Sequence, residues 1–466
     1  MSRPGSMRRF WAPHAWLGGV WRAQVLLEVD AQGSFVAVTP DAGPAPPDTL
    51  TLAGPVLPSL VDAHSHAFQR AMAGLAERRE HGEDDFWSWR DRMYGVALRI
   101  TPEQLRAVAA QLYVELLRGG YTQVCEFHYL QRRPDGAAYA DPMTQSWALA
   151  DAAADAGCGL TLLPVLYERA GFDEPALRDD QRRFATTPAA VAALADAARR
   201  SGRRHVDAGL AIHSLRAAAP ASIRELRRLA DDVAGPIHIH VAEQTAEVRD
   251  CLKATGARPI EWLVRQGLLD ARWQLVHATH AEPHEIEAVA RSGAGVVICP
   301  ATEANLGDGL TDLPRWLAEG VPIGVGSDSQ VTRSWVEELR WLEYGQRLAL
   351  RRRNVCAAPE AQPATAARLF DAALAASAAP AGLAAWGLAP GARADFLVLD
   401  DGDPSLRGVP LSHRLDALVF SSPGDAIRDV YVAGEAVVVE RRHAAQDAIG
   451  ARFADAMAEL WQGKAG

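Results

Sequence analysis

Short apolar runs alternate with segments of helical character along most of this chain. The runs are rich in β-branched residues, and in order they are GPVLPSLVDAHSH, TQVCEFHYL, LTLLPVLYE, VDAGLAIHSL, PIHIHVAEQ, RWQLVHATH, GAGVVICPATE and VPIGVGSDS. A short continuous apolar run is typical of a strand that is buried on both faces, as the strands of parallel sheets are. The segments between the runs have the period of amphipathic helices. Residues 101–120, for example, begin with a threonine that can cap a helix and end at two glycines.

Eight such strands with helices between them predict a closed parallel (β/α)8 barrel of the TIM type. An open, doubly wound sheet is the alternative, but it would usually contain fewer strands, and no G-x-G-x-x-G motif follows the first run. The flanks differ from the barrel region. Residues 16–54 and 390–440 alternate between polar and apolar side chains and contain turn residues, as β-hairpins do.

We therefore predict an α/β protein with two domains and a terminal helix. Residues 56–385 form the (β/α)8 barrel. Residues 1–55 and 386–445 pair into one small β-sandwich domain, which is discontinuous in sequence because it combines both chain ends. Residues 446–466 form the C-terminal helix.

Composition limits the partners that this chain can have. Its 466 residues carry a formal net charge of -10, which argues against nucleic acid or an anionic membrane surface as the main partner. The five cysteines contain no C-x-x-C pair, so neither a disulfide framework nor a thiolate zinc site is expected. We find no apolar run of about 18 residues and no signal-peptide core near the start. These features predict a cytoplasmic protein.

Histidines and carboxylates gather at the ends of the apolar runs. In a parallel barrel the catalytic side chains come from the C-terminal ends of the strands. Eight of the 14 histidines lie at such ends. The polar residues at the ends of the first, second, fourth, fifth, sixth and eighth runs are His64, His66, Glu126, His128, Tyr129, His213, Arg216, His238, His240, Glu243, His277, His280, Ser327, Asp328 and Ser329. Unrelated histidines would be scattered over helices and loops, so we interpret the grouping as one functional site.

Four of these residues have the spacing of a metal site. His64 and His66 share one face of the first strand, because side chains alternate along a strand. The eighth strand lies beside the first in a closed barrel, which brings Asp328 within reach of the same ion. On the fifth strand, His240 is nearer the catalytic end than His238, so we favour His240 as the ligand. Three histidines and one carboxylate suit one Zn²⁺ or a similar divalent ion per subunit, with a position left open for water.

This pattern resembles the amidohydrolase superfamily, in which H-x-H ends the first strand, histidines follow the fifth and sixth strands, and an aspartate follows the eighth. GARADFLVLD is similar to the segment that returns to the composite β-sandwich of that superfamily. Two-metal members generally bridge their ions with a carboxylated lysine at the end of the fourth strand. The fourth run ends in AIHSLRA, and neither lysine of this chain, Lys253 or Lys464, is near it. The resemblance therefore implies the one-metal form.

Longer stretches resemble the formimidoylglutamate deiminases of histidine degradation within this superfamily. These stretches are HSHAFQRAMAGLAE, FWSWRDRMY, EFHYL, HSLRA, IHIHVAEQ, LVHATH, CPATEANLGDG, GSDS and EELRWLEYGQRL, and they run in the expected order from residue 64 to residue 348. The resemblance implies hydrolysis of N-formimidoyl-L-glutamate to N-formyl-L-glutamate and ammonia. It also implies a homodimer.

The same resemblance implies a role for each catalytic residue. Asp328 would touch both the ion and the attacking water, and it can accept the water's proton. His277, directly after the sixth strand, can hydrogen-bond the attacking oxygen or help to hold the water, whereas His280 is expected in the following loop. Glu243, in HVAEQ, can carry a proton to the departing nitrogen, because ammonia leaves far more readily than amide ion.

The implied substrate is a small anion with two carboxylates, so its pocket should offer guanidinium groups or neutral donors. Arg216, on the loop after the fourth strand, is the first candidate for a carboxylate clamp, and Arg90 in FWSWR is the second. Gln69, Tyr129 and His213 are further candidate contacts with the substrate.

Two alternatives stay open at this point. One is another one-metal deaminase that acts on a purine-like ring, whose pocket would need apolar or aromatic walls and few arginines. The other is a catalytically silent barrel that serves as a binding module. Such a module would usually have lost some of its metal ligands.

Overall fold

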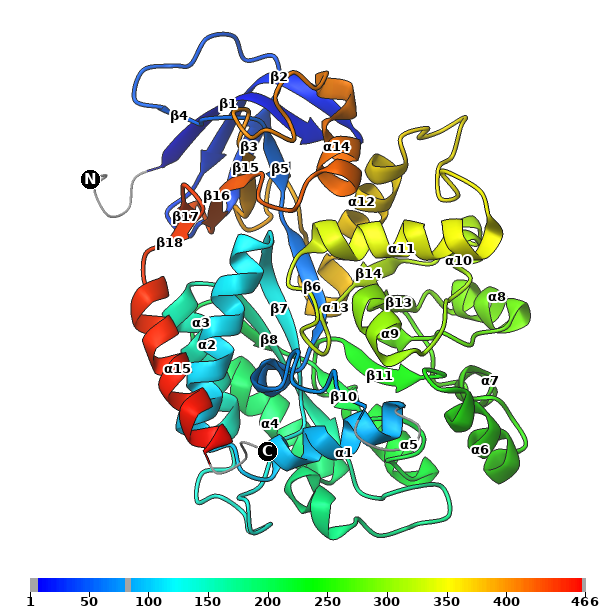
Figure 1. Ribbon diagram of the computed structural model, residues 1–466. Coiled ribbons are helices and arrows are strands. Elements are labelled where there is room, and N and C mark those ends of the chain that lie inside the picture. The colour runs from blue at the N-terminus through cyan, green and yellow to red at the C-terminus, as the bar shows by residue number, and fades with distance from the viewer. Residues whose placement is uncertain (1–6, 80–84, 463–466) are drawn as a thin grey trace.

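The computed structural model describes residues 7–79 and 85–462, and a barrel of parallel strands lies at its centre (Figure 1). The strands follow the order β6-β7-β8-β10-β11-β12-β13-β14. They are β6 (Leu60–Ser65), β7 (Tyr121–His128), β8 (Gly159–Leu166), β10 (Leu210–Ile212), β11 (Ile237–Val241), β12 (Trp273–His277), β13 (Gly295–Ile298) and β14 (Ile323–Val325). A bridge between Ser65 and Asp328 brings the first and last strands together. The predicted barrel is confirmed.

One glycine divides the fourth strand of the barrel in two. β9 (Val206–Ala208) pairs with β8, and after Gly209 the chain continues as β10, which pairs with β8 and β11. A Cβ atom at Gly209 would lie 2.5 Å from the carbonyl oxygen of Pro236, so a side chain there would push the start of β11 away. Because Gly209 has no side chain, the fourth strand can approach the start of β11 closely at this position.

Helices cover the outside of the barrel. The helix predicted at residues 101–120 is α2 (Pro102–Arg118), which Thr101 and Gln104 begin with a capping box and Gly119 ends. Its apolar side chains are buried against the barrel. The other outer helices are α3 (Thr144–Ala156), α4 (Pro188–Arg200), α5 (Pro220–Leu229), α6 (Thr245–Thr255), α7 (Pro259–Arg265), α8 (Pro283–Ser292), α9 (Pro300–Leu306), α10 (Leu313–Ala318), α11 (Trp335–Leu350) and α12 (Thr365–Ala376).

Both chain ends contribute to a second sheet, at the top of Figure 1. Its strands follow the order β18-β17-β16-β15-β5-β1-β2-β3, with β4 paired to β1. At its centre the rings of Phe396 and Tyr431 stack with centroids 4.4 Å apart, and Phe10 meets the edges of both. The strands are β1 (Arg8–Leu17), β2 (Val20–Val29), β3 (Phe35–Thr39), β4 (Leu50–Thr51), β5 (Val56–Pro58), β15 (Phe396–Leu399), β16 (Ile427–Val432), β17 (Glu435–Val439) and β18 (Arg442–His443).

Short helices close the two ends of the barrel. α13 (Ala378–Ala381) lies at the N-terminal end, where the carbonyl of Pro380 accepts a hydrogen bond from His238. η1 (Ala67–Ala71), α1 (Phe86–Ala97) and η2 (Asp179–Phe184) lie at the other end, at the bottom of Figure 1. η3 (Leu411–His413) and α14 (Arg414–Ser421) complete the C-terminal region.

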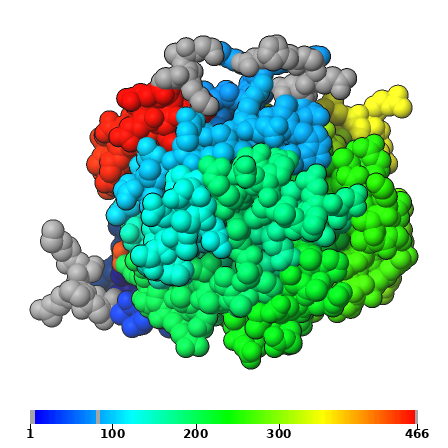
Figure 2. Space-filling model, turned by 90° about the horizontal axis from the view of Figure 1, so that it is seen from below, coloured from blue at the N-terminus to red at the C-terminus, as the bar shows by residue number. Residues whose placement is uncertain are grey.

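The C-terminal helix α15 (Gln446–Trp461) packs against α2. Figure 2 views the molecule from the side of α1, and the red surface of α15 lies at its edge beside the cyan surface. Residues 463–466 of the predicted terminal helix lie outside the described residues. In the part of the chain that is described, no helix has the length and apolar character needed to cross a membrane.

Candidate metal centre and its pocket

Four side chains meet at the C-terminal end of the barrel. They are His64, His66, His240 and Asp328; one ligand atom of each lies within 4.8 Å of the others, and all four residues are buried. The Nε2 atoms of His64 and His66 are 3.2 Å apart, and those of His64 and His240 are 2.9 Å apart. Asp328 Oδ1 lies 3.4 Å from His64 Nε2 and 3.3 Å from His66 Nε2. The structure therefore brings together the four residues that we predicted as metal ligands.

Hydrogen bonds on the far side of the rings explain why the Nε2 atoms face one another. His66 Nδ1 donates to the carbonyl of Phe127, and His240 Nδ1 donates to that of His213, each over 2.9 Å. A neutral ring that donates from Nδ1 has a lone pair on Nε2. Burial, followed by repulsion from the other histidines, lowers the pKa of His64 and His240 well below its ordinary value. Converging lone pairs repel unless a cation lies between them, so this donor set fits a divalent metal such as zinc.

The backbone is strained where the strands deliver these side chains. Positive φ angles are rare for residues other than glycine and gather at functional sites. Asp328 is one of these residues, and its N–H donates to the carbonyl of His64 over 2.9 Å while its own carbonyl accepts from His66 N–H over 3.1 Å. Non-glycine residues with positive φ at this end of the barrel are Ala242, His277, Ala278, Asp328 and Gln330.

His277 lies beside the four converging side chains, among carboxylates. Its Nε2 is 3.7 Å from Glu243 Oε1 and 3.8 Å from Asp328 Oδ2, and its Nδ1 is 3.3 Å from Glu303 Oε1. Burial would lower the pKa of His277, but the carboxylates of Glu243 and Glu303 outweigh burial and raise it to about 10. Burial raises the pKa of Glu243 to about 7, against the opposing effect of His277. A carboxyl group with that pKa can both accept and donate a proton near neutral pH.

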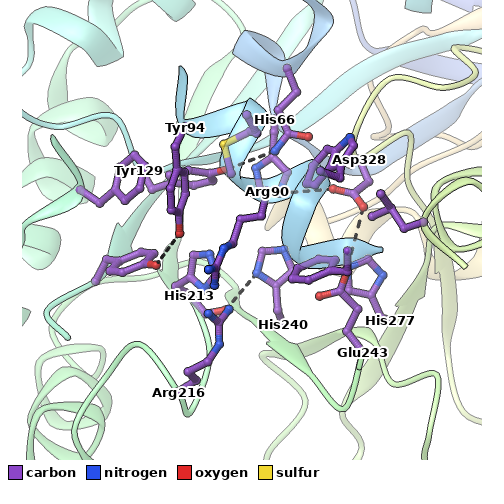
Figure 3. A pocket seen from close by; sticks show the side chains of 17 residues that line it. His66, Arg90, Tyr94, Tyr129, His213, Arg216, His240, Glu243, His277 and Asp328 are labelled. Carbon is purple, nitrogen blue, oxygen red and sulfur yellow. Dashed lines mark hydrogen bonds and ion pairs between the residues drawn. The ribbon is translucent and has the colours of Figure 1, made fainter. Parts of the chain in front are cut away.

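A pocket opens onto this centre, and Figure 3 shows the 17 residues that line it. Aromatic side chains form much of its wall. α1 lies across its mouth and contributes residues from one helix face, beginning where Asp85 caps the helix. The lining residues are His66, Gln69, Phe86, Trp89, Arg90, Met93, Tyr94, Tyr129, Tyr167, Phe184, His213, Arg216, His240, Glu243, His277, Leu306 and Asp328.

Two arginines point into this pocket from different elements. Arg90 comes from α1 and Arg216 from the loop after β10. Both guanidinium groups lie over the ring of Trp87, at 4.6 Å and 5.4 Å from its centroid. Arg90 Nε and Arg216 Nη1 are buried and have no hydrogen-bond partner among the residues described. Figure 3 shows the two guanidinium groups close together, across the pocket from Asp328 and Glu243.

Gln69 and Tyr129 line the same pocket, next to the converging histidines. Gln69 Nε2 donates to the Tyr129 hydroxyl over 3.0 Å, and the Tyr129 ring packs edge-on against His66. Gln69 Oε1 is buried without a hydrogen-bond partner in the described part of the chain. His213 also lines the pocket, and its ring meets the edge of Tyr167 with centroids 4.5 Å apart. All eight residues that we predicted as catalytic or substrate-binding therefore line one pocket.

Other polar residues at the strand ends have structural partners instead. His238 bonds to the carbonyl of Pro380 at the N-terminal end of the barrel, and His280 lies in the loop after β12, as predicted. Glu126 accepts hydrogen bonds from the Ala67 N–H and from the hydroxyl groups of Ser65 and Tyr113. These contacts join β7 to the segment that carries His64 and His66.

Sequence reasoning missed several residues of the site. Glu303, which contacts His277, comes from α9; it lies in the stretch CPATEANLGDG that carries the resemblance, but no role was predicted for it. Trp89, in FWSWRDRMY, also lines the pocket. The other aromatic wall residues have the spacing of ordinary core residues. An aromatic cluster at one helix face, in FWSWRDRMY, was the one available signal.

Comparison with known proteins identifies relatives across nearly the whole chain. Residues 56–437 match the model of the amidohydrolase family. A formimidoylglutamate deiminase from Pseudomonas aeruginosa is 45% identical over 97% of this chain and 100% of its own length. A 5-methylthioadenosine/S-adenosylhomocysteine deaminase from Natronomonas pharaonis is 31% identical over 84% of this chain and 83% of its own.

A solved structure is similar over the same extent. The crystal structure of an amidohydrolase from Brucella melitensis has a TM-score of 0.92 and 41% sequence identity, covering 97% of this chain and 99% of that one. The similarity includes both the barrel and the sheet formed by the chain ends. On these matches, the chain belongs to the amidohydrolase family.

Proposed function

We propose that this protein hydrolyses N-formimidoyl-L-glutamate to N-formyl-L-glutamate and ammonia, with one Zn²⁺ or similar divalent ion in each subunit. The formimidoylglutamate deiminase that is 45% identical over nearly the full length supports this substrate. The reaction is hydrolysis of a C–N bond in a linear amidine. Its substrate has a reactive formimidoyl group on the α-amino nitrogen, one carboxylate on the neighbouring α-carbon and a second carboxylate at the end of the side chain.

The pair of arginines carries this proposal. Arg90 and Arg216 each have a buried guanidinium nitrogen without a partner in the described chain, and both line the pocket that contains His240 and Asp328. Unpaired guanidinium donors inside a protein are costly and are explained by an anionic ligand. Two such groups near each other suit a molecule with two carboxylates. The substrate would then lie with its carboxylates at the arginines and its formimidoyl group at the histidines.

The residues that would hold the ion are His64, His66, His240 and Asp328. When bound there, a divalent ion lowers the pKa of a coordinated water to about 7 and so supplies a nucleophile at neutral pH. Asp328 is placed to accept a proton from that water, because Oδ1 faces the histidines while Oδ2 faces His277.

The chain's own residues direct the remaining proton transfers. The attacking oxygen bonds to the formimidoyl carbon, which becomes tetrahedral, and His277 donates a hydrogen bond to that oxygen. Glu243, 3.7 Å from His277, delivers a proton to the terminal nitrogen. The C–N bond then breaks and ammonia leaves, while the remaining proton of the oxygen passes to the Glu243 carboxylate, so that the oxygen becomes the carbonyl of the formyl group and Glu243 is protonated again. Gln69 Oε1, which lacks a partner in the described chain, can accept a hydrogen bond from the amidine N–H and align it.

A purine-like ring substrate is the alternative, and one relative at 31% identity is a deaminase of adenosine derivatives. The aromatic wall of the pocket would suit such a ring, whereas the arginines would not. Ammonia release should be measured with formimidoylglutamate, guanine and adenosine under the same conditions. We expect turnover of formimidoylglutamate at least a hundredfold above the rings; turnover of a ring alone would overturn the proposal.

We further propose that the protein acts in the cytoplasm, in histidine degradation, and as a homodimer. The name of its relative supports the role in histidine degradation, and the resemblance to formimidoylglutamate deiminases implies the homodimer. Sedimentation analysis of purified protein would test the dimer; a monomer at micromolar concentration would contradict it.

A further inference from the structure

Cys299 is a buried thiol beside the catalytic residues, and the proposed mechanism gives it no role. It follows directly on β13 and is fully buried. Its Sγ, a nitrogen of His277 and a carboxylate oxygen of Asp328 all lie within 4.8 Å of one another. The other four cysteines are also buried and free, but none of them belongs to a comparable cluster in the described chain. Three donor atoms of metal-binding type therefore converge at a second point.

Glu303 holds two of these three residues in place. Its Oε1 accepts a hydrogen bond from the Cys299 N–H over 3.0 Å and lies 3.3 Å from His277 Nδ1. Because Nδ1 contacts Glu303, the other ring nitrogen of His277, Nε2, faces Asp328 and lies 3.8 Å from its Oδ2. Because Asp328 Oδ1 faces the first set of ligands and Oδ2 faces His277, one carboxylate can serve both sets.

The charges around this cluster favour a cation. Glu243, Glu303 and Asp328 all lie within ion-pair distance of His277. Among the described residues, these three carboxyl groups outnumber the one cationic side chain that contacts all of them, the imidazole of His277. Excess buried carboxylates are costly unless a positive charge compensates them.

We propose that Cys299, His277 and Asp328 form a second metal site, which takes a thiophilic divalent ion such as Cd²⁺ or excess Zn²⁺. A thiolate, an imidazole and a carboxylate suit soft or borderline ions and not Mg²⁺ or Ca²⁺. On binding, a sulfur–metal bond replaces the S–H bond of Cys299 and a nitrogen–metal bond replaces the Nε2–H bond of His277, and both protons pass to the buffer. Asp328 then bridges the two ions.

Occupation of this site inhibits the enzyme, an inference that rests on the proposed function. The ion takes up the lone pair of His277 Nε2, so this ring can no longer donate to the attacking oxygen. It also engages Asp328 Oδ2, the oxygen that would receive the water's proton. The second ion therefore blocks two groups of the mechanism without displacing the first ion.

Metal stoichiometry tests the site without any activity assay. Full-length protein that holds one equivalent of zinc is dialysed against micromolar CdCl₂, and total bound zinc plus cadmium is counted by mass spectrometry. The near-ultraviolet absorption of a cadmium–thiolate bond is recorded on the same samples. Wild type should hold two ions and show the absorption. The variant Cys299→Ala should hold one ion and lack the absorption, whereas Cys158→Ala should behave as wild type, because this buried cysteine directly precedes the N-terminal end of β8 and belongs to neither ligand cluster.

Two outcomes would overturn the site: a single bound ion in wild type, or a second ion and thiolate absorption that persist in Cys299→Ala. The first equivalent of metal reports that the variant is folded, and Cys299→Ser provides a closer replacement if the alanine variant is not. The inhibitory role has a separate test, in which excess Cd²⁺ should lower wild-type turnover at least tenfold more than that of Cys299→Ala. Equal inhibition of both would overturn that role.

Discussion

The Nδ1 hydrogen bonds of His66 and His240 decide which ring nitrogens face the centre. Each accepting carbonyl belongs to a neighbouring strand end, at Phe127 and His213. These carbonyls therefore hold the rings in one tautomer and one orientation before any ion arrives. In other metal sites, removal of such a hydrogen-bond partner typically lowers the metal affinity by about 10- to 100-fold. At the residue scale, backbone carbonyl groups therefore orient two of the three metal-binding histidine rings.

Glu243→Gln should lower kcat by about 100- to 10,000-fold, because general acid–base groups typically contribute that much. Its carboxyl group, with a pKa raised by burial to about 7, can cycle its proton near neutral pH, and an amide cannot. Bound metal and melting temperature should stay near wild type. The control is Glu225→Gln, an exposed glutamate on α5. Steady-state kinetics measure kcat for each protein. A Glu243→Gln variant that keeps a tenth or more of wild-type kcat would show that Glu243 is not the general acid–base group.

Arg216→Met should raise KM for formimidoylglutamate by about 10- to 150-fold, since hydrogen bonds to charged groups contribute about 1.5 to 3 kcal/mol. The change in kcat should be smaller, because the lost contact lies away from the reacting carbon. Arg90→Met should have an effect of the same kind. Arg224→Met, on the exposed face of α5, is the control. An unchanged KM in both pocket variants would contradict the proposed carboxylate clamp.

At the scale of elements, α2 and η1 form a support behind the metal centre. Glu115 of α2 accepts hydrogen bonds from Arg70 of η1 over 2.8 and 2.9 Å. It also lies 3.2 Å from Arg333, in the loop that follows Asp328. One carboxylate thus joins the loop after the first strand to the loop after the eighth. α15 adds to this support, because Trp461 donates to the carbonyl of Ala71 at the end of η1.

The contact between β7 and β6 predicts a pH-dependent stability. Burial raises the pKa of Glu126 from 4.5 to about 8. A carboxyl whose pKa is raised by folding binds its proton more tightly in the folded state, so its contribution is fully present below about pH 4.5. That contribution is lost as the pH rises toward about 8, at up to about 1.4 kcal/mol per pH unit.

Glu126→Gln removes this titration, so its stability relative to wild type should increase between pH 5.5 and pH 7.5, by roughly 1 to 3 kcal/mol. The midpoints of urea unfolding of both proteins at the two pH values measure the difference. A difference that is independent of pH would show that Glu126 stays ionised in the folded protein. Exposed Glu225→Gln should show no pH-dependent difference from wild type and serves as the control.

At the scale of the whole molecule, one ion would connect three parts of the barrel wall. Its ligands come from β6, from β11 and from the segment after β14. An ion that binds only the folded chain stabilises it by about 2.7 kcal/mol when its concentration is 100 times the dissociation constant. A chelator should therefore lower the melting temperature by several degrees, and added zinc should restore it.

Asp328→Ala is the matched variant for this effect, because it removes one ligand and leaves the three histidines. Its melting temperature should respond less to chelator and to zinc than that of wild type, and its turnover should be lost. Differential scanning fluorimetry with and without chelator measures both proteins. A full zinc response in Asp328→Ala would show that the carboxylate does not hold the ion.

The order of strands and helices in the barrel could be predicted from the chain alone. Buried strands are short and continuously apolar, and helices carry caps such as Thr101, so both signals are local. The convergence of His64, His66, His240 and Asp328 followed from the rule that strand ends share one face of a barrel. The first strand of the second sheet, β1, was largely missed, because its alternation is weak, although it forms a hairpin with the adjacent β2.

The sequence by itself therefore determined the fold class and the metal-type ligand set, since both depend on local pattern and strand periodicity, whereas the candidate substrate contacts followed from the resemblance to formimidoylglutamate deiminases. Only the tertiary structure showed which side chains from different strands and helices contact one another around the site. It placed α1 across the pocket, set Glu303 against His277, and brought Cys299 beside Asp328. These contacts join residues from different strands and helices, and they depend on rotamers and on barrel closure, which no local pattern encodes.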